Sequence, residues 1–250
     1  MSDDRKIFLI TGTSRGIGYE LARYYSRDHM VYGCSRSQPD TDGDDQFNSG
    51  NYHHTCLDVA DPDAVEGLFN TIKKSSKNLD VLINNAGTYA DLLAPLFARM
   101  KGDAKARAVA DIRKTLDTNL LGNFFFSSQF FPLLKKNEGG RIINLSSIAV
   151  PLKLVGTSIY AASKAACETL AQVMAREFAP KVTVNTVGPS IVDSEMTADW
   201  SEEKVRETLA LLALNKKSTV ADICHVIDFF INPRSAVITG ESIYLGGVIT

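Results

Sequence analysis

Short apolar, β-branched runs alternate with longer stretches of helical periodicity along the whole chain. We expect the short runs to form strands, at residues 7–10, 30–34, 52–57, 81–84, 141–145, 182–187 and 242–245. We expect the longer stretches to form helices, at residues 18–27, 63–74, 111–135, 158–178 and 220–231. Continuous apolar runs suit strands that are buried on both faces of a parallel sheet. The alternation therefore predicts an α/β protein, a doubly wound parallel sheet with helices on both faces.

Two connections between these elements are unusually long. No repeat or low-complexity linker divides the 250 residues, so we expect a single domain over residues 1–250. Residues 88–118 form a charge-mixed stretch, and residues 191–217 contain an amphipathic segment at 202–212. Ligands of such folds bind outside the carboxyl ends of the strands. We therefore expect the connection 191–217 to form a substrate lid, with Met196 and Trp200 as its apolar part. The alternatives are surface decoration for the connection and simple packing for the tryptophan.

The balance of charge and apolar residues excludes several classes of partner. The chain has 27 Lys and Arg against 29 Asp and Glu, a formal net charge of −2, so we expect no nucleic acid partner. No stretch approaches the roughly 18 apolar residues that span a bilayer, and residues 1–6 are polar. We therefore expect a cytoplasmic protein that does not bind membranes.

The cysteines and histidines predict no metal site. The four cysteines lie far apart without a C-x-x-C pair, and we expect them to be small buried residues in a reducing compartment: Cys34, Cys56, Cys167 and Cys224. His53 and His54 are adjacent at the start of an expected strand. Adjacent strand residues point to opposite faces, so these two cannot share one ion and a structural role is favoured.

A glycine-rich turn follows the first expected strand directly. Residues 11–18 read Thr-Gly-Thr-Ser-Arg-Gly-Ile-Gly. Glycines let backbone approach a diphosphate, and a helix N-terminus offers unpaired N–H groups to it. The G-x-x-x-G-x-G spacing differs from the usual G-x-G-x-x-G of dinucleotide-binding folds, and such turns also serve tight packing. The position of the turn favours a Rossmann-type site with these binding residues: Gly12, Ser14, Arg15, Gly16, Ile17 and Gly18.

The end of the second strand indicates which nicotinamide cofactor fits. An acidic residue there would bind the ribose of NAD, whereas an arginine accommodates the 2′-phosphate of NADP. This chain reads Ser35-Arg36-Ser37 and has no carboxylate before Asp40. The alternative is that Arg15 and Arg36 are solvated surface residues. Because both stand where the phosphate would lie, the sequence predicts NADP(H).

Tyr160 and Lys164 lie four residues apart on one expected helix, among small residues. This spacing places them on one face of the helix. A tyrosine exchanges its proton efficiently near neutral pH when a neighbouring ammonium stabilises the phenolate. An isolated Tyr-x-x-x-Lys is more often ordinary packing, so the pair needs the support of other motifs.

Those other motifs are present and occur in a definite order. They are Thr-Gly-x-x-x-Gly-x-Gly, Asn84-Asn85-Ala86-Gly87, Asn119, Ser147 and Tyr160-x-x-x-Lys164. Together they resemble the short-chain dehydrogenase/reductase family over nearly the whole chain. The resemblance implies a reversible ketone or aldehyde reductase that transfers a hydride between NADP(H) and a small carbonyl or alcohol substrate.

The resemblance also implies roles for individual residues. Tyr160 would be the acid–base group, Ser147 would bind the substrate oxygen, and Lys164 would hold the nicotinamide ribose. Asn119 would anchor the water that leads protons to Lys164. Further cofactor contacts are implied for Ser35, Arg36, Ser37, Asp58, Val59, Asn85, Ala86, Gly87, Val192 and Ser194, as well as Tyr160 and Lys164.

The chain departs from the family pattern at several places. Ser190 stands where the family commonly has glycine, Ser194 replaces a threonine, and Leu245 stands where an aspartate is frequent. The interval between Asn85 and Asn119 is longer than usual, which suggests an unusual substrate entrance. A nucleotide-sensing regulator without chemistry, or an epimerase or dehydratase, remains an alternative function.

The family also implies a homodimer or homotetramer. The aromatic-rich helix at residues 123–131 is a possible interface, although core burial explains its phenylalanines equally well.

Overall fold

The computed structural model of the protein describes residues 5–40, 47, 50–90, 93–136, 139–194 and 196–248. The polar N-terminal tetrapeptide, parts of the two long connections and the last two residues thus lie outside the described residues. Among the described residues, no helix is both long and apolar enough to cross a bilayer.

In the described part of the chain, seven parallel strands form one sheet in the order β3-β2-β1-β4-β5-β6-β7, which confirms the predicted doubly wound α/β fold. The strands are β1 (Ile7–Thr11), β2 (Met30–Ser35), β3 (Tyr52–Cys56), β4 (Val81–Asn84), β5 (Gly140–Leu145), β6 (Val182–Gly188) and β7 (Ser242–Tyr244). The chain reverses its direction of winding between β1 and β4, where ligands of such sheets bind. Every strand lies within a residue or two of its prediction.

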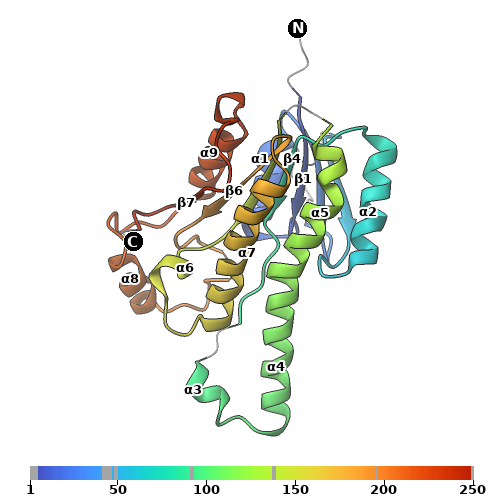
Figure 1. Ribbon diagram of the computed structural model, residues 1–250. Coiled ribbons are helices and arrows are strands. Elements are labelled where there is room, and N and C mark those ends of the chain that lie inside the picture. The colour runs from blue at the N-terminus through green and yellow to red at the C-terminus, as the bar shows by residue number, and fades with distance from the viewer. Residues whose placement is uncertain are drawn as a thin grey trace.

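Helices cover both faces of this sheet (Figure 1). On one face α1 (Gly16–Tyr25) and α9 (Val220–Ile231) pack against Phe8 and Ile10 of β1. On the other face α2 (Pro62–Ser75), α5 (Gly122–Leu134) and α7 (Ser158–Glu177) pack against Leu9. Because neighbouring strand residues point to opposite faces, a continuous apolar strand supplies both cores.

The expected helix at 111–135 begins earlier than predicted. Helix α4 (Gly102–Leu116) continues through a π-helical turn, η2 (Asp117–Leu121), into α5. Only Thr115 is buried in α4, which projects past the sheet (Figure 1). Residues 102–107 of α4 are exposed, so the hydrophobic pattern does not mark where the helix begins.

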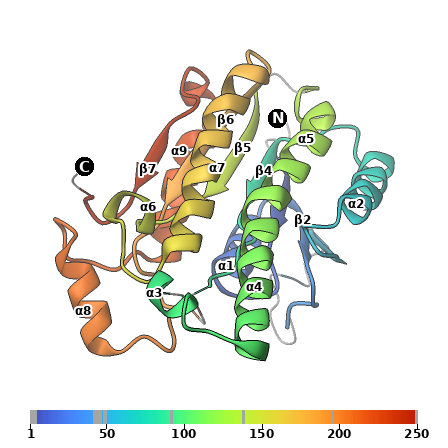
Figure 2. The same cartoon turned by 60° about the horizontal axis from the view of Figure 1, so that its bottom comes forward.

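Three further helices surround the carboxyl edge of the sheet. They are α3 (Ala94–Phe97), α6 (Ala149–Leu152) and α8 (Glu202–Ala210). Helix α8 falls within the predicted segment 202–212. Figure 2 brings this edge forward and shows α3, α4 and α8 around it. The two long connections therefore gather at the end of the sheet where a ligand would bind.

Candidate functional site

The turn between β1 and α1 is held by close backbone contacts. Gly12 and Gly16 have positive φ angles, 76° and 60°, which favour glycine. A Cβ on Gly18 would overlap the carbonyl oxygen of Gly12 and the side-chain amide of Asn85. That amide donates to the carbonyl oxygens of Thr11, at 2.9 Å, and Gly12, at 3.3 Å. Asn85, which directly follows the neighbouring strand β4, therefore fixes the turn.

The N-terminus of α1 fits a diphosphate group. No side chain caps its N-terminus, where Arg15 is the N-cap residue. The space in front of Gly16 is open, because a Cβ built there meets no atom within 4 Å. Backbone N–H groups at an uncapped helix start, reached across a bare glycine, form an anion site. The dinucleotide cofactor predicted from the sequence fits the residues present.

The strand pairing brings both predicted phosphate-binding arginines to the same edge. The backbone N–H of Gly12 donates to the carbonyl oxygen of Cys34 at 2.7 Å, which ties the turn to the end of β2. Ser35 is buried, and its hydroxyl donates to the carbonyl oxygen of Ser37 at 2.9 Å. Arg15 and Arg36 are both exposed.

Asp58 and Val59 follow β3 on the same edge. Asp58 is exposed, and its Oδ1 accepts from the backbone N–H of Ala60 at 3.0 Å. Val59 is buried and packs on Gly122, where an added Cβ would come within 2.7 Å of the valine Cγ2. Asp58 is thus presented toward solvent, whereas Val59 forms part of the core.

Tyr160 and Lys164 lie together on α7, one turn apart and both buried. The Lys164 ammonium is 5.9 Å from the centre of the Tyr160 ring. It donates to the carbonyl oxygen of Leu145, the last residue of β5, at 2.7 Å. The ring of Tyr89, which sequence reasoning missed, lies edge-on to Tyr160 at 5.0 Å.

Asn119 sits in the π-helical turn η2, where helices often place functional residues. Its Oδ1 accepts from the backbone N–H of Thr88 at 2.8 Å, and its Nδ2 donates to the Thr88 carbonyl at 3.0 Å. The same Nδ2 donates to the hydroxyl of Ser163 at 2.9 Å. Ser163, three residues after Tyr160, donates in turn to the Tyr160 carbonyl at 2.7 Å. Asn119 therefore joins the loop after β4 to the helix of the tyrosine.

Gly87 separates Lys164 from Asn119. A Cβ on Gly87 would lie 3.3 Å from Lys164 Nζ and 3.4 Å from Asn119 Oδ1. Both polar groups thus flank the same backbone position, and a larger residue there would press on both.

Ser147 and Ser146 have different surroundings at the end of β5. Ser147 is partly exposed, and its Oγ accepts from the backbone N–H of Ala149 at 3.1 Å. Ser146 is buried and donates to Glu168, which also accepts from Tyr244 at 2.6 Å. The hydroxyl of Ser147 is therefore the more accessible of the two.

The departures after β6 fit the local structure. Ser190 does not have a positive φ angle, so glycine is not required there. Its hydroxyl donates to the carbonyl oxygen of Lys216 at 3.1 Å and bonds to the hydroxyl of Ser218 at 2.8 Å. Leu245 packs against the core next to α1 and α9. Val192 is buried, and the backbone N–H of Ser194 donates to Thr197 Oγ1 at 3.3 Å.

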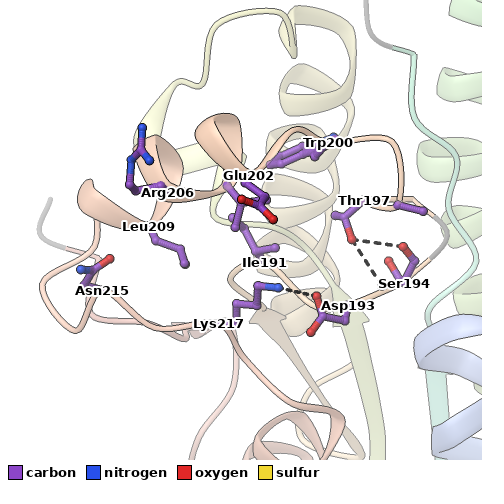
Figure 3. A pocket seen from close by; sticks show the side chains of 12 residues that line it. Ile191, Asp193, Ser194, Thr197, Trp200, Glu202, Arg206, Leu209, Asn215 and Lys217 are labelled. Atoms are coloured by element: carbon purple, nitrogen blue, oxygen red, sulfur yellow. Dashed lines mark hydrogen bonds and ion pairs between the residues drawn. The ribbon is translucent and has the colours of Figure 1, made fainter.

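A pocket of about 580 Å³ opens beside this segment (Figure 3). Apolar side chains, among them Trp200, Val205 and Leu209, line it together with polar ones. Lys217 and Asp193 form an ion pair of 2.6 Å in its wall. The pocket includes Ser194 but none of Asn119, Ser147, Tyr160 and Lys164, so it does not contain the candidate catalytic group. Met196, the other residue of the expected lid, is exposed.

The cysteines and histidines have no arrangement that suggests metal binding. Cys34, Cys167 and Cys224 are buried as expected, but Cys56 is exposed, so that part of the prediction was wrong. It is the last residue of the edge strand β3. Burial raises the pKa of the Cys34 and Cys167 thiols, which makes them unreactive. Within the described ranges no cluster of His, Cys, Asp or Glu could hold an ion.

The comparisons with known proteins give one consistent result. The family model described as short chain dehydrogenase matches residues 6–205. The chain is 32% identical to the 3-oxoacyl-[acyl-carrier-protein] reductase FabG of Vibrio cholerae, over 99% of this chain and 98% of that protein. It is 29% identical to FabG of Escherichia coli K12, with the same coverage. A short-chain dehydrogenase/reductase structure from Brucella melitensis superposes with a TM-score of 0.83 at 26% identity, covering 98% of this chain and 97% of that one.

Proposed function

The chain belongs to the short-chain dehydrogenase family, and from this premise we propose that it is a reversible, NADP(H)-dependent ketone or aldehyde reductase. The observation that carries the proposal is the buried pair of Tyr160 and Lys164 on α7. Asn119 bonds to Ser163 of the same helix, and Ser147 follows β5, whose last carbonyl accepts from Lys164. The pair lies at the carboxyl edge of the sheet, where the uncapped start of α1 offers an anion site. Proton-handling groups and a nucleotide site thus share one edge.

The residues of this chain handle the proton and the developing charge. The nicotinamide cofactor, when bound, supplies the hydride for reduction or takes it up in oxidation. A carbonyl that gains a hydride at carbon develops negative charge on oxygen, which needs a proton donor and a second hydrogen bond. We assign the proton to the Tyr160 hydroxyl and the second hydrogen bond to Ser147 Oγ. Lys164 stabilises the phenolate that remains, and Asn119 positions the loop and helix that carry these groups.

The proposed cofactor site follows the carboxyl ends of the central strands. The diphosphate would lie at the start of α1, and Ser35, Arg36, Ser37 and Arg15 would surround the 2′-phosphate of NADP(H). We propose the following further cofactor contacts: Gly12, Ser14, Gly16, Ile17, Gly18, Asp58, Val59, Asn85, Ala86, Gly87, Tyr160, Lys164, Val192 and Ser194. Arg15 and Arg36 are exposed and no carboxylate occurs between Ser35 and Asp40, which supports NADP(H) over NAD(H).

The substrate is proposed to enter beside the connection 191–217. Its pocket combines apolar side chains with polar ones, which suits a small carbonyl compound with an apolar part. The relatives in Vibrio cholerae and Escherichia coli are named as reductases of a 3-oxoacyl group, which is a ketone. We therefore expect ketones to be the most informative substrates to test first.

Replacing Tyr160 with phenylalanine tests the proposed chemistry. Tyr160→Phe removes only the hydroxyl, so we expect turnover with an identified ketone to fall at least roughly 100-fold while NADPH affinity stays close to wild type. Tyr32→Phe is a matched control, because the Tyr32 hydroxyl bonds to Ser75 and Ser76 at the C-terminal end of α2. Near-normal turnover in Tyr160→Phe would refute the catalytic assignment and favour a regulator that binds nucleotide without chemistry.

A further inference from the structure

A chain of polar contacts links the glycine-rich turn to the end of β2. The Tyr52 hydroxyl lies 2.9 Å from Thr13 Oγ1 and 2.8 Å from His54 Nδ1. On the other side of the imidazole ring, His54 Nε2 lies 3.2 Å from Ser35 Oγ. The neighbouring strand β3 thus connects two segments that the proposed function places around NADP(H).

The surroundings of this chain keep it in place. Thr13 is 0% and Ser35 7% exposed, so polar atoms without partners there would cost free energy. Gly33 leaves the necessary room, because a Cβ on it would overlap the Tyr52 hydroxyl and come within 2.6 Å of Thr13 Oγ1. The contacts are therefore part of how β1, β2 and β3 pack at this edge.

The hydrogen-bond directions give His54 a definite task. The Ser35 hydroxyl donates its one hydrogen to the carbonyl oxygen of Ser37. Ser35 Oγ must then accept from His54, which requires a hydrogen on Nε2. Burial lowers the pKa of His54, against a smaller opposing effect of a backbone hydrogen bond with Ser37, so the ring is neutral at pH 7. The Tyr52 hydroxyl donates its hydrogen to Thr13 Oγ1, so His54 Nδ1 accepts from the Thr13 hydroxyl at 3.3 Å. His54 thereby orients Ser35, and Ser35 closes the turn that contains Arg36.

We propose that His54 is a positioning residue that sets the preference for NADP(H) by fixing the turn 35–37 around the 2′-phosphate. This inference rests on the proposed function, because it requires that NADP(H) is the cofactor. His54 acts through Ser35 and does not itself contact the cofactor. Since NAD(H) differs from NADP(H) only by that phosphate, His54 matters for one cofactor and not for the other.

The test compares affinities for the two reduced cofactors, measured by direct fluorescence titration without substrate. His54→Phe keeps a planar ring but removes both nitrogen atoms. We expect its NADPH dissociation constant to rise about 5- to 10-fold, the worth of about one hydrogen bond, with the NADH constant changed less than about 2-fold. His54→Gln retains an amide donor near the position of Nε2 and should restore most of the NADPH affinity.

The adjacent histidine provides a matched control. His53 is exposed and its ring lies 5.6 Å from that of Tyr32, on the other side of the strand. His53→Phe should leave both dissociation constants unchanged. Arg36→Ala is the reference variant that defines the full loss of the phosphate contact. If His54→Phe does not fold, Tyr52→Phe removes the hydroxyl that orients Thr13 toward His54 Nδ1 and should weaken NADPH binding in the same selective way.

The outcomes separate this inference from the proposed function. If His54→Phe weakened NADPH and NADH binding equally, the role of His54 would be purely structural. If neither dissociation constant changed, the inference would also be overturned. In either case, if the wild type preferred NADPH, the proposed NADP(H) assignment would still stand. A wild type that prefers NADH would refute the NADP(H) assignment and this inference together.

Discussion

Replacing Gly18 by alanine tests whether close packing, and not helix flexibility, explains the last glycine of the turn. A Cβ at this position would overlap the Gly12 carbonyl oxygen and the Asn85 amide nitrogen, both of which are fixed. Relieving the overlap means moving backbone or breaking the bonds from Asn85 to Thr11 and Gly12, of 2.9 and 3.3 Å. The variant should therefore lose both stability and cofactor affinity.

The expected magnitude combines three contributions. Overpacking costs about 1–3 kcal/mol, and a weakened hydrogen bond costs about 0.5–1.5 kcal/mol. Alanine regains about 0.5–1 kcal/mol over glycine inside a helix. The free energy of unfolding should thus fall by about 0.5–4 kcal/mol, which lowers the melting temperature of a chain of this length by about 1–16 °C.

Gly67→Ala is the matched control in another helix. Gly67 lies on the exposed side of α2, and a Cβ built on it meets no atom within 4 Å. This variant should raise the melting temperature by about 1–4 °C, because only the helix-propensity gain remains. Thermal unfolding followed by circular dichroism, together with NADPH titration, measures both effects. If Gly18→Ala melted at or above the wild-type temperature with full NADPH affinity, the packing argument would be refuted.

Three further predictions concern stability, pH and assembly. Ser190→Ala removes the bonds to Lys216 and Ser218 and should lower the unfolding free energy by about 1–3 kcal/mol in urea titrations; an unchanged midpoint would contradict this. Burial lowers the pKa of His29 from its ordinary 6.5, so its neutral form stabilises the fold above that value and the contribution is lost as the pH falls through 6.5 toward the folded pKa. His29→Gln should therefore lose less stability than wild type between pH 7 and pH 5, and equal losses would exclude His29 as the cause. We also expect light scattering at micromolar concentration to give a multiple of the 27.3 kDa chain mass, and a species of 27.3 kDa alone would contradict self-association.

The sheet could be predicted from the sequence because its strands are buried on both faces. Short continuous apolar runs such as Ile7–Thr11 are typical of strands buried on both faces. Each glycine-rich or asparagine-rich segment follows one of these runs directly. The order of the strands places these segments at one edge of the sheet. The candidate catalytic residues followed from their spacing once the family resemblance was recognised.

Other parts of the molecule depend on contacts that no local pattern encodes. The first residues of helix α4, 102–107, are exposed, so no buried apolar residue marks its start at Gly102. The phenylalanines of helix α5 were expected either in the core or at an interface between subunits. Phe126 and Phe130 are fully buried in the core, whereas Phe124 is 44% exposed. The sequence predicts only a structural role for His54, and its contacts with Thr13 and Ser35 could not be predicted because those residues lie 41 and 19 positions away.

The exposed helix α4 also determines how the candidate site can fluctuate. A helix with one buried side chain among 15 residues gains little from tertiary packing, so it can open locally at small cost. Helix α5, by contrast, buries seven of its residues and belongs to the cooperative core. Asn119 lies at the junction of these two parts, and its three hydrogen bonds to Thr88 and Ser163 hold the last turn before the core. Amide hydrogens should therefore exchange rapidly along α4 and slowly from η2 onward, so that the edge of the site coincides with the boundary between two cooperative folding units.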